Sequence, residues 1–333
     1  MKEKRLFRFG VIVLSIVLVA CTGGSSEAGC PAIDGREINV VATTPMIGEF
    51  VSQVGGDNIN LTVLMPAEAD PHNYDPSPQD AGKIADADLV FYTGLRYEPS
   101  ALVKLLENSA CSSEVLAEVG ENVFPIEFKE EGHDDHDEEG HDDHDEEGHD
   151  DHEGHDHGAY DPHFWFDPNR VSYAAEYIES KLVEFDPSNA SDYEAAGKAY
   201  VTELKGLVSQ VSELISTIPS QNRKLITTHE SLGYLEAKFG LEVLSTIIPS
   251  VDSANEISPS QLVGVIDVIE DNNVKVIFIE AEAPSVYADT IVSETGIKAV
   301  EGLWVETLKE GQSYPEFLFE AVELIVENLT NTD

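Results

Sequence analysis

Short apolar segments alternate with segments of helical spacing in two separate parts of this chain, and that alternation limits the fold more than any other feature. The apolar segments are residues 38–43, 59–65 and 88–94 in the first half, and residues 224–229, 241–247 and 274–280 in the second half. Strands separated by helices predict a parallel sheet in an α/β arrangement. The sequence therefore predicts two α/β lobes, one in each half of the chain.

A long amphipathic pattern lies between these halves. Apolar residues recur at three- and four-residue steps from Tyr193 to Ile218, Pro219 ends the pattern, and Ser191 and Glu194 fit a capping box at its start. A helix of about 28 residues is roughly 40 Å long, so we interpret it as a stiff connector. Its length disfavours the alternative, a helix buried within one lobe. The predicted division is an N-terminal lobe over residues 36–186, a linking helix over 187–220 and a C-terminal lobe over 221–333.

The N-terminus has the pattern of an export signal. Four basic residues lie within the first eight, and an apolar run then ends in the sequence Leu-Val-Ala-Cys. A small residue before Cys21 resembles the bacterial lipobox, in which the cysteine becomes the lipidated N-terminus. We therefore predict a signal peptide over residues 1–20, a flexible tether over 21–35 and a membrane-anchored extracytoplasmic protein, periplasmic or on the cell surface. The alternative is an ordinary secretory signal with an incidental cysteine.

Two further cysteines, Cys30 and Cys111, lie in the predicted exported part of the chain. Exported proteins occupy an oxidising compartment, which favours a disulfide between these residues. The alternative is two separate thiols, because the sequence does not show that the side chains meet.

The charge of the chain favours cationic ligands. The sequence has 64 acidic and 19 basic residues, for a formal net charge of −45. Such a chain should repel nucleic acid and anionic lipid and should attract cations. Sixteen of the acidic residues lie in residues 130–157, so the rest of the chain is acidic as well.

Three of the eleven histidines lie outside that acidic run: His72, His163 and His229. His72 and His163 each lie in an Asp-Pro-His loop, and proline makes such loops rigid. His72 follows a predicted strand and His229 closes another, and ligands of α/β lobes bind beyond the carboxyl ends of strands. Imidazole is the commonest protein ligand for metals, and three imidazoles suit zinc. The alternative for each histidine is a hydrogen-bonded residue of the core.

Four segments together resemble the metal-binding lipoproteins of bacterial zinc and manganese ABC importers. These segments read ADPHNYDPSP, DPHFWFDP, TTHESLGYLEAKFG and VIFIEAEAPS, and the resemblance runs in order from about residue 36 to 330. It implies two α/β lobes joined by a long rigid helix, with the metal in the cleft between them. It also implies a partner permease with its ATPase.

The resemblance carries metal ligands over to individual positions. His72 and His163 match the first two ligands of the family, and His229 matches the third, which is histidine in zinc members and often glutamate in manganese members. The fourth ligand of the family is an aspartate, whereas the matching stretch here, EGLWVETL, has Glu306. Glutamate is one methylene longer, so Glu306 ligates directly, acts through a water or leaves the fourth position to solvent. Glu280 is a substitute ligand or a neighbouring carboxylate.

Asp161, in the same loop as His163, is a candidate for orienting that imidazole. The alternative for Asp161 is an ordinary turn residue before proline.

The acidic run itself, residues 130–158, contains GHDDHDEE twice in tandem and has no apolar residue. It cannot fold by burial, so we expect disorder. Its eight histidines are His133, His136, His141, His144, His149, His152, His155 and His157. We interpret the run as a low-affinity collector of metal ions. The alternatives are an acidic spacer and a sensor of zinc sufficiency.

The predicted function is extracytoplasmic capture of Zn²⁺ and its delivery to an ABC importer by a monomeric protein that is not an enzyme. One alternative keeps the fold and exchanges the ion for Mn²⁺ or Fe²⁺, although harder ions prefer more carboxylate ligands. A zinc hydrolase is a second alternative, but the sequence has no HExxH motif. A third is a surface adhesin or zinc store that does not meet a permease.

Overall fold

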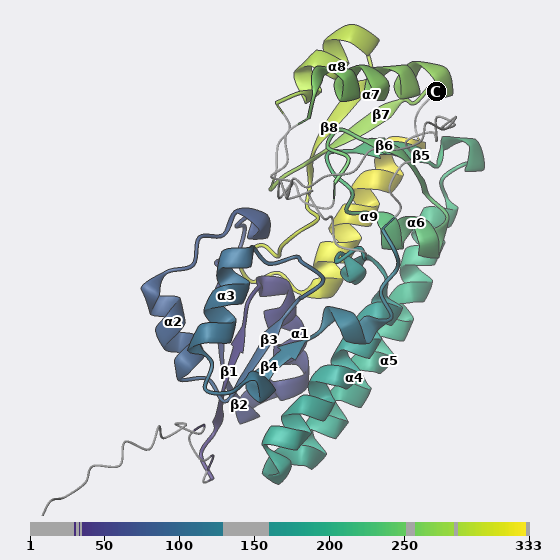
Figure 1. Ribbon diagram of the computed structural model, residues 1–333. Coiled ribbons are helices and arrows are strands. Elements are labelled where there is room, and N and C mark those ends of the chain that lie inside the picture. Colours follow the sequence, from purple (N-terminus) through teal and green to yellow (C-terminus); the bar gives the residue numbers. More distant parts are fainter. Residues whose placement is uncertain are drawn as a thin grey trace, which may run out of the picture.

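The computed structural model in Figure 1 describes Cys30, Ile33 and residues 35–128, 160–250, 257–282 and 286–330. The predicted signal peptide, Cys21 and the histidine-rich run 130–158 lie outside the described residues. Within them the chain forms two four-stranded sheets, each surrounded by helices. All pairings between the strands are parallel, which confirms the predicted α/β fold with two lobes.

The N-terminal sheet has the strand order β2-β1-β3-β4. Its strands are β1 (Ile38–Ala42), β2 (Ile59–Val63), β3 (Leu89–Tyr92) and β4 (Leu116–Glu118), and its helices are α1 (Pro45–Gly55), α2 (Pro78–Ala85) and α3 (Ser100–Ser109). Helix α1 begins directly beyond β1, because the Thr44 side chain accepts a hydrogen bond from the amide of Ile47 and Pro45 occupies the first turn.

The C-terminal sheet repeats this arrangement in the order β6-β5-β7-β8. Its strands are β5 (Lys224–Thr227), β6 (Glu242–Thr246), β7 (Val276–Glu280) and β8 (Lys298–Leu303), and its helices include α6 (Gly233–Phe239), α7 (Pro259–Asn272) and α8 (Ala288–Thr295). Ser258 caps α7 ahead of Pro259, and Gly240 ends α6 in the left-handed conformation at φ 71°.

A helical hairpin connects the lobes. Helix α4 (Pro168–Phe185) turns back through a short 3₁₀ segment into α5 (Ala190–Ser216), and the two helices pack along each other. The predicted capping box at Ser191 is wrong, since α5 already begins at Ala190 and Asn189 caps it without a side-chain hydrogen bond. The 3₁₀ turn Pro187–Asn189 leads straight into the helix, so no separate start is needed.

The last helix, α9 (Tyr314–Thr330), also runs between the lobes and packs against α5 and the C-terminal sheet (Figure 1). At its N-terminal end, Tyr314 packs edge-on against Phe50 of α1, and Phe317 lies against Phe166. One apolar core therefore includes residues of both sheets, such as Val40 of β1 and Phe278 of β7. The lobes share buried surface through α5 and α9 rather than meeting only at a loop.

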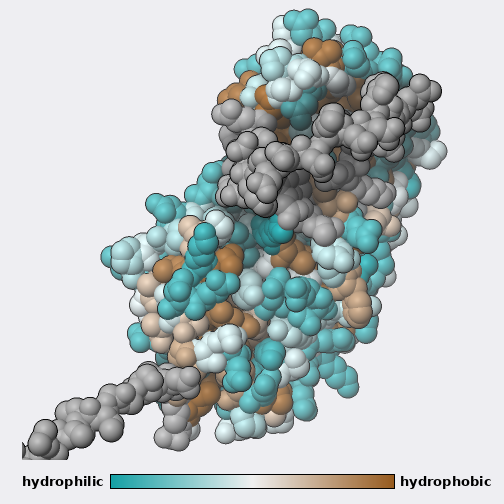
Figure 2. Space-filling view, viewed as in Figure 1, coloured by the Kyte–Doolittle hydropathy of each residue, from teal (hydrophilic) through white to brown (hydrophobic). Residues whose placement is uncertain are grey.

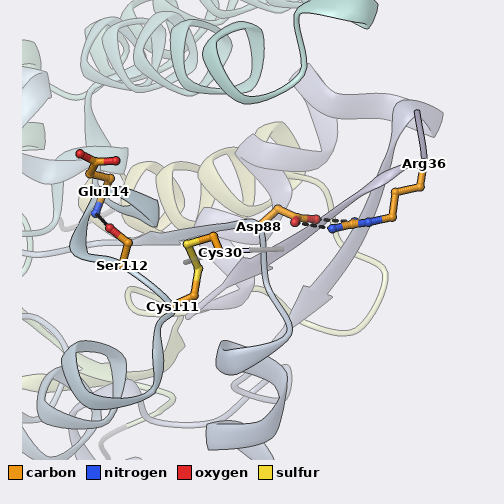
Figure 3. Close-up of a disulfide and its surroundings, with 6 residues drawn as sticks. All are labelled: Cys30, Arg36, Asp88, Cys111, Ser112 and Glu114. Atoms are coloured by element: carbon orange, nitrogen blue, oxygen red, sulfur yellow. Dashed lines mark hydrogen bonds and ion pairs between the residues drawn. A yellow bond between two sulfur atoms is a disulfide. The ribbon is translucent and has the colours of Figure 1, made fainter. Parts of the chain in front are cut away.

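The start of the described chain is fastened to the N-terminal lobe. Cys30 and Cys111 form a disulfide, and Arg36 makes two hydrogen bonds of 2.6 and 2.5 Å to the Asp88 carboxylate (Figure 3). Hydrophilic side chains cover most of the face drawn in Figure 2. Among the described helices, none has the length and apolar character needed to cross a membrane.

Candidate metal centre

Four side chains from separate parts of the chain converge where the lobes meet. His72 lies in a 3₁₀ turn after β2, His229 follows β5 and Glu306 follows β8. His163 lies directly before the 3₁₀ turn Phe164–Phe166, which leads toward α4. Because the carboxyl ends of parallel strands from both sheets face this junction, strand-end residues far apart in sequence become neighbours.

The carboxylate oxygen Oε1 of Glu306 stands among the three imidazoles. Its distances to the Nε2 atoms are 3.5 Å for His72, 3.2 Å for His163 and 2.6 Å for His229. One ligand atom from each of the four residues lies within 4.8 Å of all the others. The side chains of His163, His229 and Glu306 are fully buried, and that of His72 is 4% exposed. Such spacing matches a set of donors around one small cation.

Two carboxylates contact the Nδ1 atoms of two of the imidazoles, on the side of each ring that faces away from the cluster. Asp161 lies 2.8 Å from Nδ1 of His163 and also accepts the His163 backbone amide at 2.8 Å. Glu280 contacts Nδ1 of His229 and also accepts the Ser231 hydroxyl at 3.0 Å. A carboxylate on Nδ1 turns Nε2 toward the centre and increases the basicity of the ring. Glu280 therefore lies behind His229 and does not face the cluster, whereas Glu306 does.

The free nitrogens at this centre need a partner. The Nε2 atoms of His72 and His229 are buried, and neither has a hydrogen bond of acceptable geometry although Glu306 is nearby. A buried polar atom without a hydrogen bond is costly, and such an atom in a native structure calls for an explanation. A cation bound by these nitrogens satisfies both of them, so the chemistry of the donor set fits a metal ion.

The charges of the cluster shift the pKa values of its members in opposite directions. Burial lowers the pKa of His163, but the charge of Glu306 and the hydrogen bond to Asp161 outweigh it and raise the pKa to about 9. Burial likewise opposes protonation of His229, yet the charges of Glu280 and Glu306 raise its pKa well above the usual value. Burial disfavours the ionised form of Glu306, but the three histidines hold its pKa well below the usual range. Without metal, protons on His163 and His229 balance the neighbouring carboxylates.

Three residues that support Glu306 were missed from the sequence. The Glu282 carboxylate accepts the backbone amides of Val305 and Glu306, with its Oε1 at 3.0 and 2.9 Å. Burial and the nearby charge of Glu306 raise the pKa of Glu282 to about 8. Trp165 donates its indole N–H to the carbonyl of Val305 at 2.8 Å, and the Tyr97 hydroxyl contacts Glu306 itself. Tyr97 and Glu282 follow strands β3 and β7, so the strand-end argument applied to His72 would have found both.

Comparison with known proteins agrees with this geometry. A family model described as "Zinc-uptake complex component A periplasmic" (ZnuA) matches residues 40–328. The chain belongs to this family. It is the substrate-binding component of a metal ABC importer, which implies a permease and an ATPase as partners. The family is one of transport components rather than enzymes.

Curated relatives carry names for two different metals. The chain is 31% identical to the "High-affinity zinc uptake system protein ZnuA" of Bacillus subtilis, over 96% of each chain. It is 27% identical to the "Manganese ABC transporter substrate-binding lipoprotein PsaA" of Streptococcus anginosus, over 98% of this chain and 99% of the relative. The family therefore includes members named for zinc and members named for manganese.

Solved structures support the fold. The periplasmic zinc-binding protein TroA from Treponema pallidum superposes with a TM-score of 0.73 at 21% identity, covering 89% of this chain and all of that chain. Fe(III)-bound YtgA from Chlamydia trachomatis gives a TM-score of 0.72 at 23% identity, covering 88% of this chain and 98% of that one. At these identities the similarity establishes the two-lobed architecture.

Proposed function

We propose that this protein captures Zn²⁺ outside the cytoplasm and delivers it to its ABC importer. His72, His163, His229 and Glu306 are the proposed ligands, with Zn²⁺ as the transported substrate. The observation that carries the proposal is the convergence of three imidazole nitrogens on a single carboxylate oxygen. Three nitrogen donors and one oxygen donor suit the four-coordinate, borderline-soft Zn²⁺.

The second candidate function is binding of manganese or iron at the same four residues, and the names of relatives support it. PsaA of Streptococcus anginosus is named for manganese, and YtgA was solved with Fe(III). Hard ions prefer a larger share of oxygen ligands and higher coordination numbers, so a set with three imidazoles favours zinc over Mn²⁺. The carboxylates Asp161 and Glu280 both face Nδ1 atoms, which leaves Glu306 as the single oxygen donor among the four clustered side chains.

Metal competition tests this choice directly. We expect apo protein titrated with Zn²⁺ against a chromophoric chelator to bind one ion tightly per chain. Mn²⁺ should bind at least about a hundredfold more weakly, as the general affinity order of divalent metals predicts. A tight Mn²⁺ complex that equimolar Zn²⁺ fails to displace would overturn the assignment to zinc while leaving the site in place.

We also propose roles for the segments outside the described residues. Cys21 is the proposed lipid attachment site, and the residues between it and Cys30 form the proposed tether. This tether is shorter than the predicted segment 21–35, because the disulfide joins Cys30 to the N-terminal lobe and Ile33 packs against its core. The two-lobed domain is proposed to be a monomer. The histidine-rich run 130–158 is the proposed low-affinity collector. Its eight histidines alternate with carboxylates, and the run begins just after Phe128 and ends before Tyr160, two residues from the Asp-Pro-His loop. Membership in an importer family favours delivery over storage or adhesion.

Deleting residues 130–158 separates the collector from the centre. The shortened protein should keep one tight Zn²⁺ site and lose only the additional weak sites, which isothermal titration calorimetry resolves by stoichiometry. Loss of the tight site together with the run would refute the assignment of the four clustered residues as ligands. The matched control is the full chain with His229→Ala, which should keep the weak sites and lose the tight one.

A further inference from the structure

A hydroxyl group from the N-terminal lobe reaches the carboxylate of Glu306. The Tyr97 hydroxyl lies 2.9 Å from Oε2 of Glu306 and 2.9 Å from the Glu306 carbonyl oxygen, and it donates to this pair. The two carboxylate oxygens of Glu306 therefore have different surroundings. Oε1 faces the three imidazoles, whereas Oε2 is engaged by Tyr97.

The backbone before Tyr97 adopts an unusual conformation. Gly94, Leu95 and Arg96 have consecutive positive φ angles of 77°, 52° and 64°. Positive φ is sterically unfavourable for residues with a Cβ atom, and such residues persist where the surrounding structure holds them. Strained backbone of this kind concentrates at functional sites, so the segment that places Tyr97 is more than a simple turn.

Two carboxylates hold that segment in place. Glu98 is buried and accepts the amides of Thr93 at 2.6 Å and Gly94 at 2.9 Å. Glu118 accepts the amide of Leu95 at 2.9 Å. The amide of Tyr97 itself donates to the Gly94 carbonyl at 2.9 Å. These hydrogen bonds offset the unfavourable dihedral angles and fix the direction in which Tyr97 leaves the loop.

The aromatic ring of Tyr97 is fixed as well. It is 1% exposed and packs edge-on against His72, with centroids 4.9 Å apart, and against Trp165 at 5.2 Å. A fully packed ring cannot swing its hydroxyl away from Oε2 without disturbing the site. The hydrogen bond to Glu306 is therefore built into the N-terminal lobe before a metal arrives.

We infer that Tyr97 is a positioning residue for metal selection: by engaging Oε2 it restricts Glu306 to one ligand atom, Oε1. This inference rests on the proposed function, in which these four residues bind Zn²⁺. One carboxylate oxygen and three imidazoles make four donors, the number that Zn²⁺ prefers. A carboxylate free to offer both oxygens adds a fifth donor, and the larger oxygen-rich set suits Mn²⁺ better.

The test compares Tyr97→Phe with a matched control, Tyr193→Phe. The Tyr193 hydroxyl is also buried and donates to a carboxylate, Asp186, at 2.9 Å, but it lies near the start of α5, away from the metal centre. Phenylalanine keeps the ring in both variants and removes only the hydroxyl. Affinities for Zn²⁺ and Mn²⁺ are measured by chelator competition, and Co²⁺ is used as a spectroscopic probe of coordination number.

We expect wild type and Tyr193→Phe to give intense Co²⁺ absorption typical of four-coordinate sites. Tyr97→Phe should give weaker absorption, typical of higher coordination, because Oε2 becomes available. The ratio of Zn²⁺ to Mn²⁺ affinity should fall about tenfold in Tyr97→Phe, the size expected for losing one hydrogen bond to a charged group. A purely structural role would lower both affinities together and leave the Co²⁺ spectrum unchanged.

Two results overturn the inference alone. The first is a Tyr97→Phe protein that binds Zn²⁺ with an unchanged affinity ratio and an unchanged Co²⁺ spectrum. The second is a wild-type Co²⁺ spectrum that already shows five or six ligands, a measurement that does not depend on any variant folding. If wild type fails to bind Zn²⁺ at these residues, the proposed function itself is overturned, and the inference with it.

Discussion

The strand pairing is regular in the N-terminal sheet and interrupted in the C-terminal sheet. In the N-terminal lobe the pairings of β1 with β2 and β3 keep one unbroken register, and a disulfide and the Arg36–Asp88 ion pair fasten the start of the chain. In the C-terminal lobe the register shifts between Leu225 and Ile226 and again between Ile279 and Glu280. No cysteine occurs in residues 221–333.

These irregularities lie next to residues of the metal centre. The shift in β5 precedes His229, and the shift in β7 falls at Glu280, which holds His229 through Nδ1. A register shift of this kind, as in a β-bulge, bends the strand and redirects the side chains beyond it. We therefore expect the N-terminal lobe to stay fixed and the C-terminal lobe to adjust when metal enters or leaves. The shared core through α5 and α9 limits that adjustment to small shifts.

The largest effect should come from removing one ligand in each lobe. We expect His229→Ala to lower Zn²⁺ affinity by roughly a thousandfold, because the change removes a ligand and also leaves Glu280 buried without its partner. His72→Ala should cost about a hundredfold, since His72 has no such buried carboxylate on the far side of its ring within the described residues. Chelator competition measures both. Equal losses would contradict the idea that the C-terminal ligands are more tightly interlocked.

Removing the disulfide should destabilise the N-terminal lobe without changing the metal affinity of the centre. The bridge joins residues separated by 81 positions, and loss of a native disulfide typically costs about 2–5 kcal/mol of unfolding free energy. Cys30→Ser with Cys111→Ser should therefore lower the denaturation midpoint and leave Zn²⁺ affinity unchanged within about twofold, because additive behaviour is expected for distant sites. Chemical denaturation with and without Zn²⁺ provides the measurement. A marked loss of Zn²⁺ affinity would show that the disulfide influences the geometry of the metal centre.

The two carboxylates on Nδ1 atoms offer a finer comparison. Glu280→Gln and Asp161→Asn each keep the shape of the side chain and remove its charge. We expect each to lower Zn²⁺ affinity by about ten- to a hundredfold, the usual range for groups that orient metal ligands. Each carboxylate accepts the backbone amide of the histidine that it orients. The Glu280 variant should show the larger loss, because Glu280 also accepts the hydroxyl of Ser231. A larger loss for Asp161→Asn in calorimetric titrations would contradict the idea that the ligand of the C-terminal lobe depends more on its neighbouring carboxylate.

The smallest predicted effect concerns pH. The pKa of His163 is about 9, against an ordinary value of 6.5, and that of His229 is raised too. Stability from the protonated imidazoles is therefore fully present below pH 6.5 and is lost as pH rises through 9. Apo protein should lose unfolding free energy over this window, whereas Zn²⁺ affinity should rise because fewer protons compete.

Calorimetry in buffers of different ionisation enthalpy measures the protons involved. We expect binding at pH 7.5 to release about two protons, one from each raised histidine. Release of no protons would show that the imidazoles are already neutral in apo protein. The same titration in His163→Ala serves as the control, and the number of protons released should fall by about one.

Many features of this protein depend only on residues that are close together in the sequence. Strand and helix periods depend on neighbouring residues, so the alternation around residues 38–94 and 224–280 predicted the parallel fold. Helix ends are local as well, since Ser258 caps α7 within its own first turn and Gly240 ends α6. Rigid Asp-Pro-His loops and a strand-end histidine singled out His72, His163 and His229. Each of these signals lies within about ten residues of chain.

Tertiary structure decided what depends on distant partners. Whether Glu306 or Glu280 faces the imidazoles follows from how β7 and β8 enter the junction, since Glu280 ends β7 and Glu306 follows β8. The role of Tyr97 depends on a contact across 209 positions, and the disulfide on one across 81. Helix α9 packs on both lobes, through Tyr314 against Phe50 of α1 and along strands β7 and β8. Local patterns fix the elements, whereas the convergence of side chains on one point is a property of the assembled fold alone.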